Sequence, residues 1–351
     1  MPTELENILI IKPSSLGDVV LALPALSALR RNFPDAKISW LIRPEFAPLL
    51  QNHPQLDEII LFDRNLLGKA WFHPRAFCSL VSLIRRLRHN KFDAVFDLQG
   101  LFRTASLAWL SGCKTRFGMT DTREFAHIFY TDQVKHGRDC IHLVDFYLKM
   151  VQTAGASDLS VEFVVPQDPH ATDSVDKLLV QNDVKGAKYV VFVPGSAHPD
   201  KRWPIARFAT LADRIWSRFQ LPIIATGTAS ESSIIEKLVA LAHVPIVSLA
   251  GRTSLPELVV LLRSAKLVVS NDTGPGHIAA ALGTPLVLMF SWSNPARIAP
   301  YGRPECMIAR EPYSRGSKIK STDPNHSIRA ITVEEVWQKA REQLGNPNPK
   351  S

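Results

Sequence analysis

Glycine, hydroxyl, acid and imidazole side chains gather between residues 270 and 285, and their order is the part of the sequence best suited to chemistry. The run Ser-Asn-Asp-Thr-Gly-Pro-Gly-His lies between two apolar segments, which predicts a strand, a tight turn, a helix and a second strand. Small residues at a helix start leave backbone N–H groups and the positive end of the helix dipole accessible. Asp272, Thr273 and His277 surround that point, and Gly274 opens the helix. The pattern predicts a site for a phosphorylated, hydroxyl-rich ligand.

A second candidate site lies close to the N-terminus. The apolar run Ile8–Ile11 predicts a buried strand, and Lys-Pro-Ser-Ser-Leu-Gly-Asp follows it, ending at Asp18 before an apolar helix. A carboxylate just beyond the first strand lies at the ligand-binding edge of an open α/β sheet. An acid in the first turn of a helix is also favoured without any function. Spacing alone therefore leaves both interpretations of Asp18 open, a reactive carboxylate and a helix cap.

Two further strand ends carry polar groups. The turn after Tyr189–Val193 offers backbone donors, the hydroxyl of Ser196 and the ammonium of Lys201, which suits a phosphate. The alternative is an ordinary loop with a surface lysine. After the next strand, Glu231 is placed to bind ribose hydroxyls or a base edge, although an acid at the start of a helix is the simpler interpretation.

Several common motifs are missing from the sequence. It contains no G-x-G-x-x-G after the first strand, no Walker A sequence, no D-x-D and no H-E-x-x-H. We therefore expect chemistry without a tightly bound metal, with other groups offsetting the charge of a phosphorylated leaving group. The four cysteines form no C-x-x-C pair, which indicates reduced thiols in a cytoplasmic protein.

The order of apolar runs predicts a doubly wound α/β architecture with two domains, because nearly continuous apolar strands alternate with helices. The expected boundaries are 1–167 and 168–330, with a C-terminal helix and tail at 331–351. A polar stretch from Pro166 to Gly186 is interpreted as the junction. The expected strands are Ile8–Ile11, Ile38–Ile42, Glu58–Phe62, Ala94–Asp97, Val161–Val165, Tyr189–Val193, Ile223–Thr226, Ile246–Leu249, Leu267–Ser270 and Leu286–Phe290.

Charge is concentrated in one segment of the 351-residue chain. Residues 64–123 hold eleven Lys and Arg against three acids, a difference that equals the net charge of +8. An anionic lipid surface, an acidic acceptor and a scattered solvated surface all remain open as explanations. We do not expect a nucleic-acid partner, because the segment lacks a recognised binding motif. No run is apolar enough to span a membrane, and the acidic N-terminus does not read as a signal peptide.

Taken together, these segments resemble the bacterial lipopolysaccharide heptosyltransferases, glycosyltransferase family 9. The similarity follows the chain in order and rests on five motifs, at Lys12–Asp18, Asp97–Arg103, Asp121–Glu124, Asp200–Trp203 and Asp272–His277. The family implies the GT-B fold, two Rossmann-like domains that face each other across a cleft. The first domain would then bind the acceptor and the second the nucleotide-sugar donor.

The resemblance also implies roles for individual residues. Asp18 matches the general base. The donor-site positions are Ser196, Ala197, Lys201, Glu231, Thr253, Asp272, Thr273, Gly274 and His277, and the expected acceptor contacts are Ser15, Gly17, Arg64, Gln99, Arg103 and Arg123. Two departures stand out. Ser196-Ala197 replaces a pair of threonines, and Ser291-Trp292-Ser293 replaces the more usual G-P-T/S.

The function implied is inverting, metal-independent transfer of heptose from ADP-heptose to the Kdo and heptose inner core of lipopolysaccharide. ADP-heptose is a substrate, so no cofactor is expected. A monomer at the inner face of the cytoplasmic membrane, peripherally bound, fits an anionic glycolipid acceptor. The alternatives are another GT-B transferase or epimerase and a non-catalytic sugar-nucleotide or lipid-binding protein. The sequence does not determine which core heptose is added or the oligomeric state.

Overall fold

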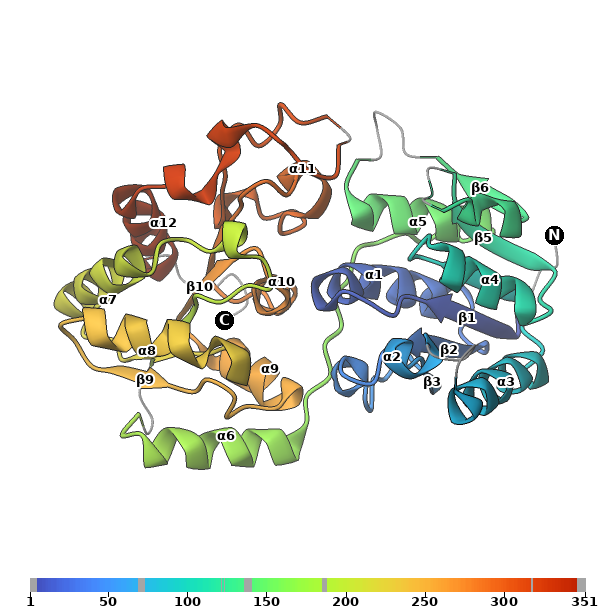
Figure 1. Ribbon diagram of the computed structural model, residues 1–351, viewed down its shortest axis with the longest axis horizontal. Coiled ribbons are helices and arrows are strands. Elements are labelled where there is room, and N and C mark those ends of the chain that lie inside the picture. The colour runs from blue at the N-terminus through green and yellow to red at the C-terminus, as the bar shows by residue number, and fades with distance from the viewer. Residues whose placement is uncertain are drawn as a thin grey trace. The chain divides into compact units, whose positions relative to one another are not determined.

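The computed structural model describes residues 5–68, 73–120, 122, 124–135, 141–184, 188–316 and 318–345. Two six-stranded parallel sheets organise it, one in the unit Met1–Pro166 and one in the unit Gln167–Ser351. Figure 1 shows helices on both faces of each sheet. The predicted doubly wound α/β class is confirmed.

The first sheet has the strand order β3-β2-β1-β4-β5-β6. Helices α3 and α4 cover one face, where Leu83, Leu87 and Leu107 pack against Leu9 and Ile11. Helices α1 and α5 pack together, and more than half of the residues of each helix are buried. The strands are β1 (Asn7–Ile11), β2 (Lys37–Ile42), β3 (Glu58–Leu61), β4 (Ala94–Asp97), β5 (Thr115–Met119) and β6 (Asp132–Val134), and the helices are α1 (Leu16–Asn32), α2 (Arg64–Leu67), α3 (Pro74–His89), α4 (Phe102–Leu110) and α5 (Leu143–Thr153).

The second sheet has the order β12-β11-β10-β7-β8-β9. Helices α7, α8 and α12 supply Phe208, Leu238 and Val336 to the core on one face, and α6, α9 and α10 pack with one another. The strands are β7 (Val190–Val193), β8 (Ile223–Ala225), β9 (Ile246–Ser248), β10 (Leu267–Asn271), β11 (Leu286–Met289) and β12 (Met307–Ile308), and the helices are α6 (Pro169–Gln181), α7 (Ile205–Phe219), α8 (Ser232–Leu241), α9 (Leu255–Ser264), α10 (Gly274–Ala281), α11 (Pro295–Ile298) and α12 (Val333–Gly345).

Both sheets reverse their strand order once. The reversal lies between β1 and β4 in the first sheet and between β7 and β10 in the second. Loops that leave two such strands at their carboxyl ends turn in opposite directions and open a crevice, which is where ligands of doubly wound folds bind. The candidate residues Asp18 and Asp272 each follow a strand at one of these points.

Two sequence expectations were wrong. Residues 161–165 are apolar except for Glu162 and form no strand of either sheet. Other contacts hold them, such as that of His53 Nε2 with the Val164 carbonyl at 2.9 Å. The two units do divide at Pro166, inside the predicted junction, but the polar stretch that follows forms helix α6, capped by the Asp168 side chain. Strands β5, β6 and β12 were missed. Among the described residues, no helix has the length and apolar character that crossing a membrane requires.

Candidate functional site

The loops after β7 and β10 are joined by one side chain that the sequence did not single out. Asn271, the last residue of β10, donates from Nδ2 to the Pro194 carbonyl at 2.8 Å and accepts from the Trp203 backbone N–H at 3.1 Å. Both partners flank the loop that carries Ser196 and Lys201. This buried amide therefore fixes the loop after β7 against the start of the turn that bears Asp272.

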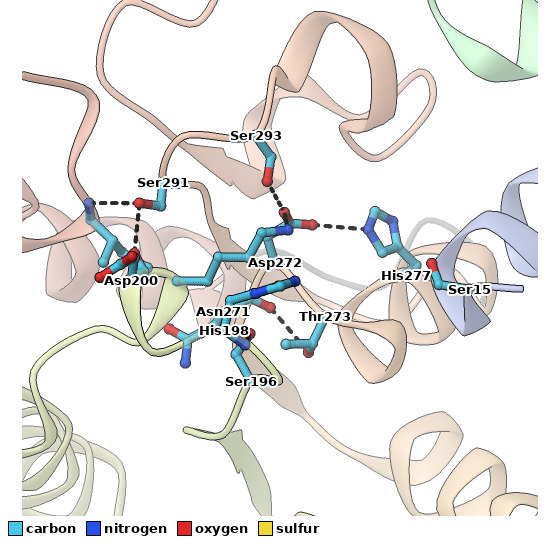
Figure 2. Close-up of polar contacts among 12 residues, drawn as sticks. Ser15, Ser196, His198, Asp200, Asn271, Asp272, Thr273, His277, Ser291 and Ser293 are labelled. Carbon is cyan, nitrogen blue, oxygen red and sulfur yellow. Dashed lines mark hydrogen bonds and ion pairs between the residues drawn. The ribbon is translucent and has the colours of Figure 1, made fainter. Parts of the chain in front are cut away.

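Asp272 is the centre of the second unit's polar network. One carboxylate oxygen, Oδ2, accepts from the Lys201 ammonium and from the Ser293 hydroxyl, both at 2.6 Å. The other oxygen, Oδ1, lies 3.2 Å from His277 Nε2. Figure 2 shows Ser293 and His277 approaching the carboxylate from different sides. A carboxylate has about four lone-pair sites, so Oδ1 keeps capacity for one further donor.

Burial and charge act in opposite directions on Asp272. The side chain is 4% exposed, and burial alone would raise its pKa. The hydrogen bond from His277 and the positive charge of Lys201 outweigh that cost and hold the pKa of Asp272 well below its usual range. The carboxylate is consequently ionised at neutral pH and compensated by a cation. It is an organising group rather than a proton acceptor.

Helix α10 begins where the sequence predicts. Thr273 precedes it in an extended conformation, and Gly274 is its first residue. Gly276, however, is a glycine because of packing and not because a ligand needs the space. A Cβ there would lie 2.4 Å from Leu288 Cδ1. His277 is buried, and its Nδ1 has no hydrogen-bond partner among the described residues. That buried nitrogen has hydrogen-bonding capacity that the described residues do not use.

Ser196 and Ala197 differ in how much of them is accessible. Ser196 is buried, its hydroxyl accepts from the His198 N–H at 3.3 Å, and its carbonyl accepts twice from Arg202. Ala197 is exposed. The Ser196 side chain thus shapes its own turn, while Ala197 presents backbone and a methyl group at the surface.

Glu231 and Thr253 lie further along the same sheet edge, after β8 and β9. Glu231 Oε2 accepts from the backbone and hydroxyl of Thr228, so the helix-start interpretation is correct for that oxygen. The carboxylate also lies directly over Gly195, where a Cβ would be 2.1 Å from Oε1. Only glycine permits this approach, which brings the acid to the loop that holds Ser196. Thr253 is half-buried in the loop before α9.

In the first unit, Asp18 caps helix α1 with one carboxylate oxygen, and no described residue hydrogen-bonds the other. Its Oδ2 accepts from the backbone N–H and the hydroxyl of Ser15, both at 3.1 Å, and lies 3.8 Å from the buried Lys12 ammonium. No described residue hydrogen-bonds Oδ1, and the side chain is 33% exposed. Capping and reactivity are therefore compatible in this carboxylate. Gly17, one residue earlier, is buried in the same first turn.

The loop after β4 meets the loop after β1. Gln99 Oε1 accepts from the Ser14 backbone N–H at 3.4 Å, and Lys12 Nζ donates to the Leu98 carbonyl at 3.1 Å. Beneath them Asp97 is fully buried: it accepts from the Tyr130 hydroxyl at 2.7 Å and from backbone N–H groups of the turn. Asp97 begins one of the five motifs, and the sequence alone assigns it no role. Its contacts make it the anchor of the turn that presents Gln99.

The three candidate arginines have different settings. Arg64 is exposed at the start of α2, after the cap Asp63, and Arg103 is half-buried in the first turn of α4. Arg123 lies outside the described residues. In the described part of the chain, no group of three or more His, Cys, Asp or Glu side chains is arranged to hold a metal ion.

Comparisons with known proteins agree with this geometry. The sequence profile of glycosyltransferase family 9 (heptosyltransferase) matches residues 80–328. Lipopolysaccharide heptosyltransferase 1 of Pseudomonas aeruginosa is 29% identical over 314 residues, which are 87% of this chain and 84% of that protein.

Solved structures show the same fold over nearly the whole chain. A glycosyltransferase family 9 protein from Veillonella parvula has a TM-score of 0.83 and 24% identity, with 98% of each chain covered. An E. coli heptosyltransferase with ADP-2-deoxy-2-fluoro heptose has a TM-score of 0.71 and 25% identity, covering 96% of this chain and 99% of that one. The predicted GT-B class, two Rossmann-like doubly wound domains, is confirmed.

Proposed function

Because this chain belongs to glycosyltransferase family 9, the heptosyltransferases, we propose that it transfers heptose from ADP-heptose to the Kdo and heptose inner core of lipopolysaccharide. The transfer inverts the anomeric centre and needs no metal ion. The observation that carries the proposal is the buried network of Lys201, Asp272 and His277 at the strand reversal of the second sheet. The E. coli relative that binds an ADP-sugar analogue supports the choice of donor.

The second unit binds the donor. Lys201, the start of α10 and the backbone of the Ser196 turn hold the negative charge that builds on the departing diphosphate. The unfilled lone pair of Asp272 Oδ1 and the unpartnered Nδ1 of His277 suit hydroxyl groups of the sugar. Glu231 Oε1, held against Gly195, suits the ribose hydroxyls, and Ala197 and Thr253 line the same edge.

The first unit binds the acceptor and supplies the base. Asp18 takes the proton from the acceptor hydroxyl as its oxygen attacks the anomeric carbon from the face opposite ADP. The free Oδ1 and partial exposure of this side chain support the role, since the proton must reach an oxygen that has no other donor. Ser15, Gln99, Arg64, Arg103 and Arg123 contact the anionic acceptor.

The acceptor is a lipid, so the protein works as a monomer bound peripherally to the inner face of the cytoplasmic membrane. Exposed apolar side chains support this location. They lie on α4, in the neighbouring turn η2 (Ala126–Phe129) and just before that turn. Phe102, Trp109, Phe125 and Ile128 are 47% to 75% exposed. Aromatic groups favour the membrane interface, and the basic segment 64–123 favours anionic lipid. Co-sedimentation with anionic vesicles that is unchanged in Phe125→Ser/Ile128→Ser would contradict this surface.

The deciding experiment is a transfer assay read by mass spectrometry. Purified protein is incubated with ADP-heptose and either Kdo-lipid A or its heptosylated product, with EDTA present, and with UDP-sugars as the control donors. We expect a mass increase of one heptosyl group on one acceptor, with ADP-heptose alone. Transfer from UDP-sugars indicates another GT-B transferase, and donor binding without transfer to either acceptor indicates a binding protein. Either result rejects the proposal.

A further inference from the structure

The segment Ser291–Ser293, which departs from the family pattern, places an aromatic ring among cations. Trp292 follows β11 and is half-buried. The Lys201 ammonium lies 4.5 Å from its ring centroid, the Lys320 ammonium lies 4.4 Å from it, and the edge of His198 packs at 5.7 Å. Both ammonium distances are within the range of a cation–π interaction.

Backbone contacts fix the position of Lys320. It faces Ser293 in an antiparallel bridge, and the Ser321 N–H donates to the Trp292 carbonyl at 2.7 Å. The Asn294 side chain donates to two carbonyls of the same segment, at 2.8 and 2.6 Å. The buried Arg315 donates to the Ser291 carbonyl at 2.8 Å. Lys320 therefore reaches the Trp292 ring from a segment that is hydrogen-bonded to the residues just after β11.

The two lysines differ in how their charge is balanced. Lys201 is paired with Asp272 at 2.6 Å, so that pair carries no net charge. In the described chain, no carboxylate forms an ion pair with Lys320, and its side chain is exposed. A diphosphate brings at least two negative charges, and the charge of Lys201 is already offset by Asp272. Lys320 adds an ammonium beside the same ring that no described carboxylate pairs with.

We infer that Lys320 is a second cation of the diphosphate subsite, and that Trp292 is the positioning residue that holds it beside Lys201. The inference rests on the proposed donor site. The ligand chemistry is a nucleoside diphosphate: Lys320 binds the diphosphate oxygens, and the Trp292 ring keeps its ammonium close without neutralising it, which a carboxylate would do. Trp292 and Lys320 thus act as a pair.

The test measures binding of ADP, AMP and adenosine by calorimetry to the full chain and to four variants. Lys320→Gln removes the charge, Lys320→Arg keeps it, and Trp292→Leu removes the ring. Lys318→Gln is the matched control, because Lys318 is exposed in the same segment. We expect Lys320→Gln to weaken ADP about tenfold, as loss of one charged hydrogen bond does, and to leave adenosine unchanged. Trp292→Leu should also weaken ADP binding. The ADP affinity of Lys320→Arg should stay close to that of wild type, and that of Lys318→Gln should stay within twofold of it.

The outcomes separate the inference from the proposed function. If wild-type protein binds no ADP, the donor site itself fails. If it binds ADP and Lys320→Gln binds equally well, the donor site stands and the second cation is overturned. An equal loss for ADP and adenosine would also overturn it, since that pattern reports a disturbed fold or base site and not a diphosphate contact. A raised acceptor KM with unchanged ADP affinity assigns Lys320 to the acceptor and likewise overturns it.

Discussion

Each unit buries a carboxylate at the strand reversal of its sheet, and the two are partnered in opposite ways. Asp97, at the end of β4, receives neutral donors, the Tyr130 hydroxyl and backbone N–H groups. Asp272, just beyond β10, receives the Lys201 ammonium, the Ser293 hydroxyl and His277. Burial raises the pKa of Asp97 because its neutral donors offset only part of the desolvation. The hydrogen bond from His277 and the charge of Lys201 lower the pKa of Asp272 instead.

The different partners give the two buried carboxylates different roles, one in the shape of a turn and one in a charged network. Asp97 shapes a turn, since its donors belong to that turn and to the neighbouring Tyr130. Asp272 holds the Lys201 ammonium, the Ser293 hydroxyl and the His277 imidazole together. Asp18 matches neither of them: it is 33% exposed, and Oδ1 has no partner among the described residues. Of the three acids, it alone combines exposure to solvent with an open oxygen, which proton transfer requires.

The largest expected effect is that of Asp18→Asn. The amide keeps the shape of the side chain and cannot take a proton, so transfer should fall by about 10²–10⁴-fold. ADP affinity should stay within twofold of wild type, because Asp18 lies in the other unit from the donor residues. Rates come from the mass-spectrometric transfer assay and affinity from calorimetry. Ser15→Ala, which removes one hydrogen bond to Asp18, is the control and should lose far less. A variant that turns over normally would remove Asp18 from its role.

The second effect tests the ion pair. Asp272→Asn leaves Lys201 beside a neutral amide, and breaking a buried pair from one side costs about 3 kcal/mol of unfolding free energy. Lys201→Met and the double variant complete a cycle, measured by urea unfolding, in which the coupling should exceed about 1 kcal/mol. Asp213→Asn, which breaks the exposed pair with His243, should cost less than about 1 kcal/mol. Equal losses at the two sites would mean that the burial of Asp272 has no energetic consequence.

The sequence predicted the fold because most strands are short apolar runs, as parallel strands buried on both faces must be. It missed β5, β6 and β12, whose residues include charged or polar side chains or number only two. Such strands are defined by pairing with a neighbour rather than by their own pattern. Residues 161–165 show the converse, a largely apolar run that belongs to neither sheet.

The site was predicted where its members are close in sequence. Asp272, Thr273 and His277 share one turn and one helix, so spacing alone brought them together. Ser293 and Asn271 were missed: Ser293 reaches Asp272 from beyond β11, and Asn271 acts by bonding the loop after β7. Both contacts join residues far apart in the sequence, so local spacing does not predict them. The one local signal that could have indicated Ser293 is a hydroxyl four residues after the end of β11.

The third effect concerns the buried lysine of the first unit. Lys12→Met removes the donor to the Leu98 carbonyl and the cation beside Asp18. A buried carbonyl left without its donor costs about 2 kcal/mol, measured by urea unfolding. Turnover should fall as well, though less than in Asp18→Asn. Lys37→Met is the control, because Lys37 is 49% exposed and its pair with Glu58 lies at the surface. Unchanged stability in Lys12→Met would show that the Leu98 carbonyl does not depend on this lysine.

The smallest effect sharpens the comparison most directly, because the two buried acids should respond to pH with opposite signs. Asp97 has a raised folded pKa, so as pH falls the folded state takes the proton before the unfolded chain does, and wild type gains stability relative to Asp97→Asn. That gain is complete near 3.8, the pKa of aspartate in the unfolded chain.

Asp272 has a lowered folded pKa, so the unfolded chain protonates first. Wild type then loses stability relative to Asp272→Asn as pH falls past the unfolded value and on toward the folded one. Urea midpoints of wild type and both variants between pH 7 and about pH 3 measure the two differences. Curves that run in the same direction would mean that the partners of these carboxylates do not set their protonation, and the distinction between a turn anchor and a charged centre would fail.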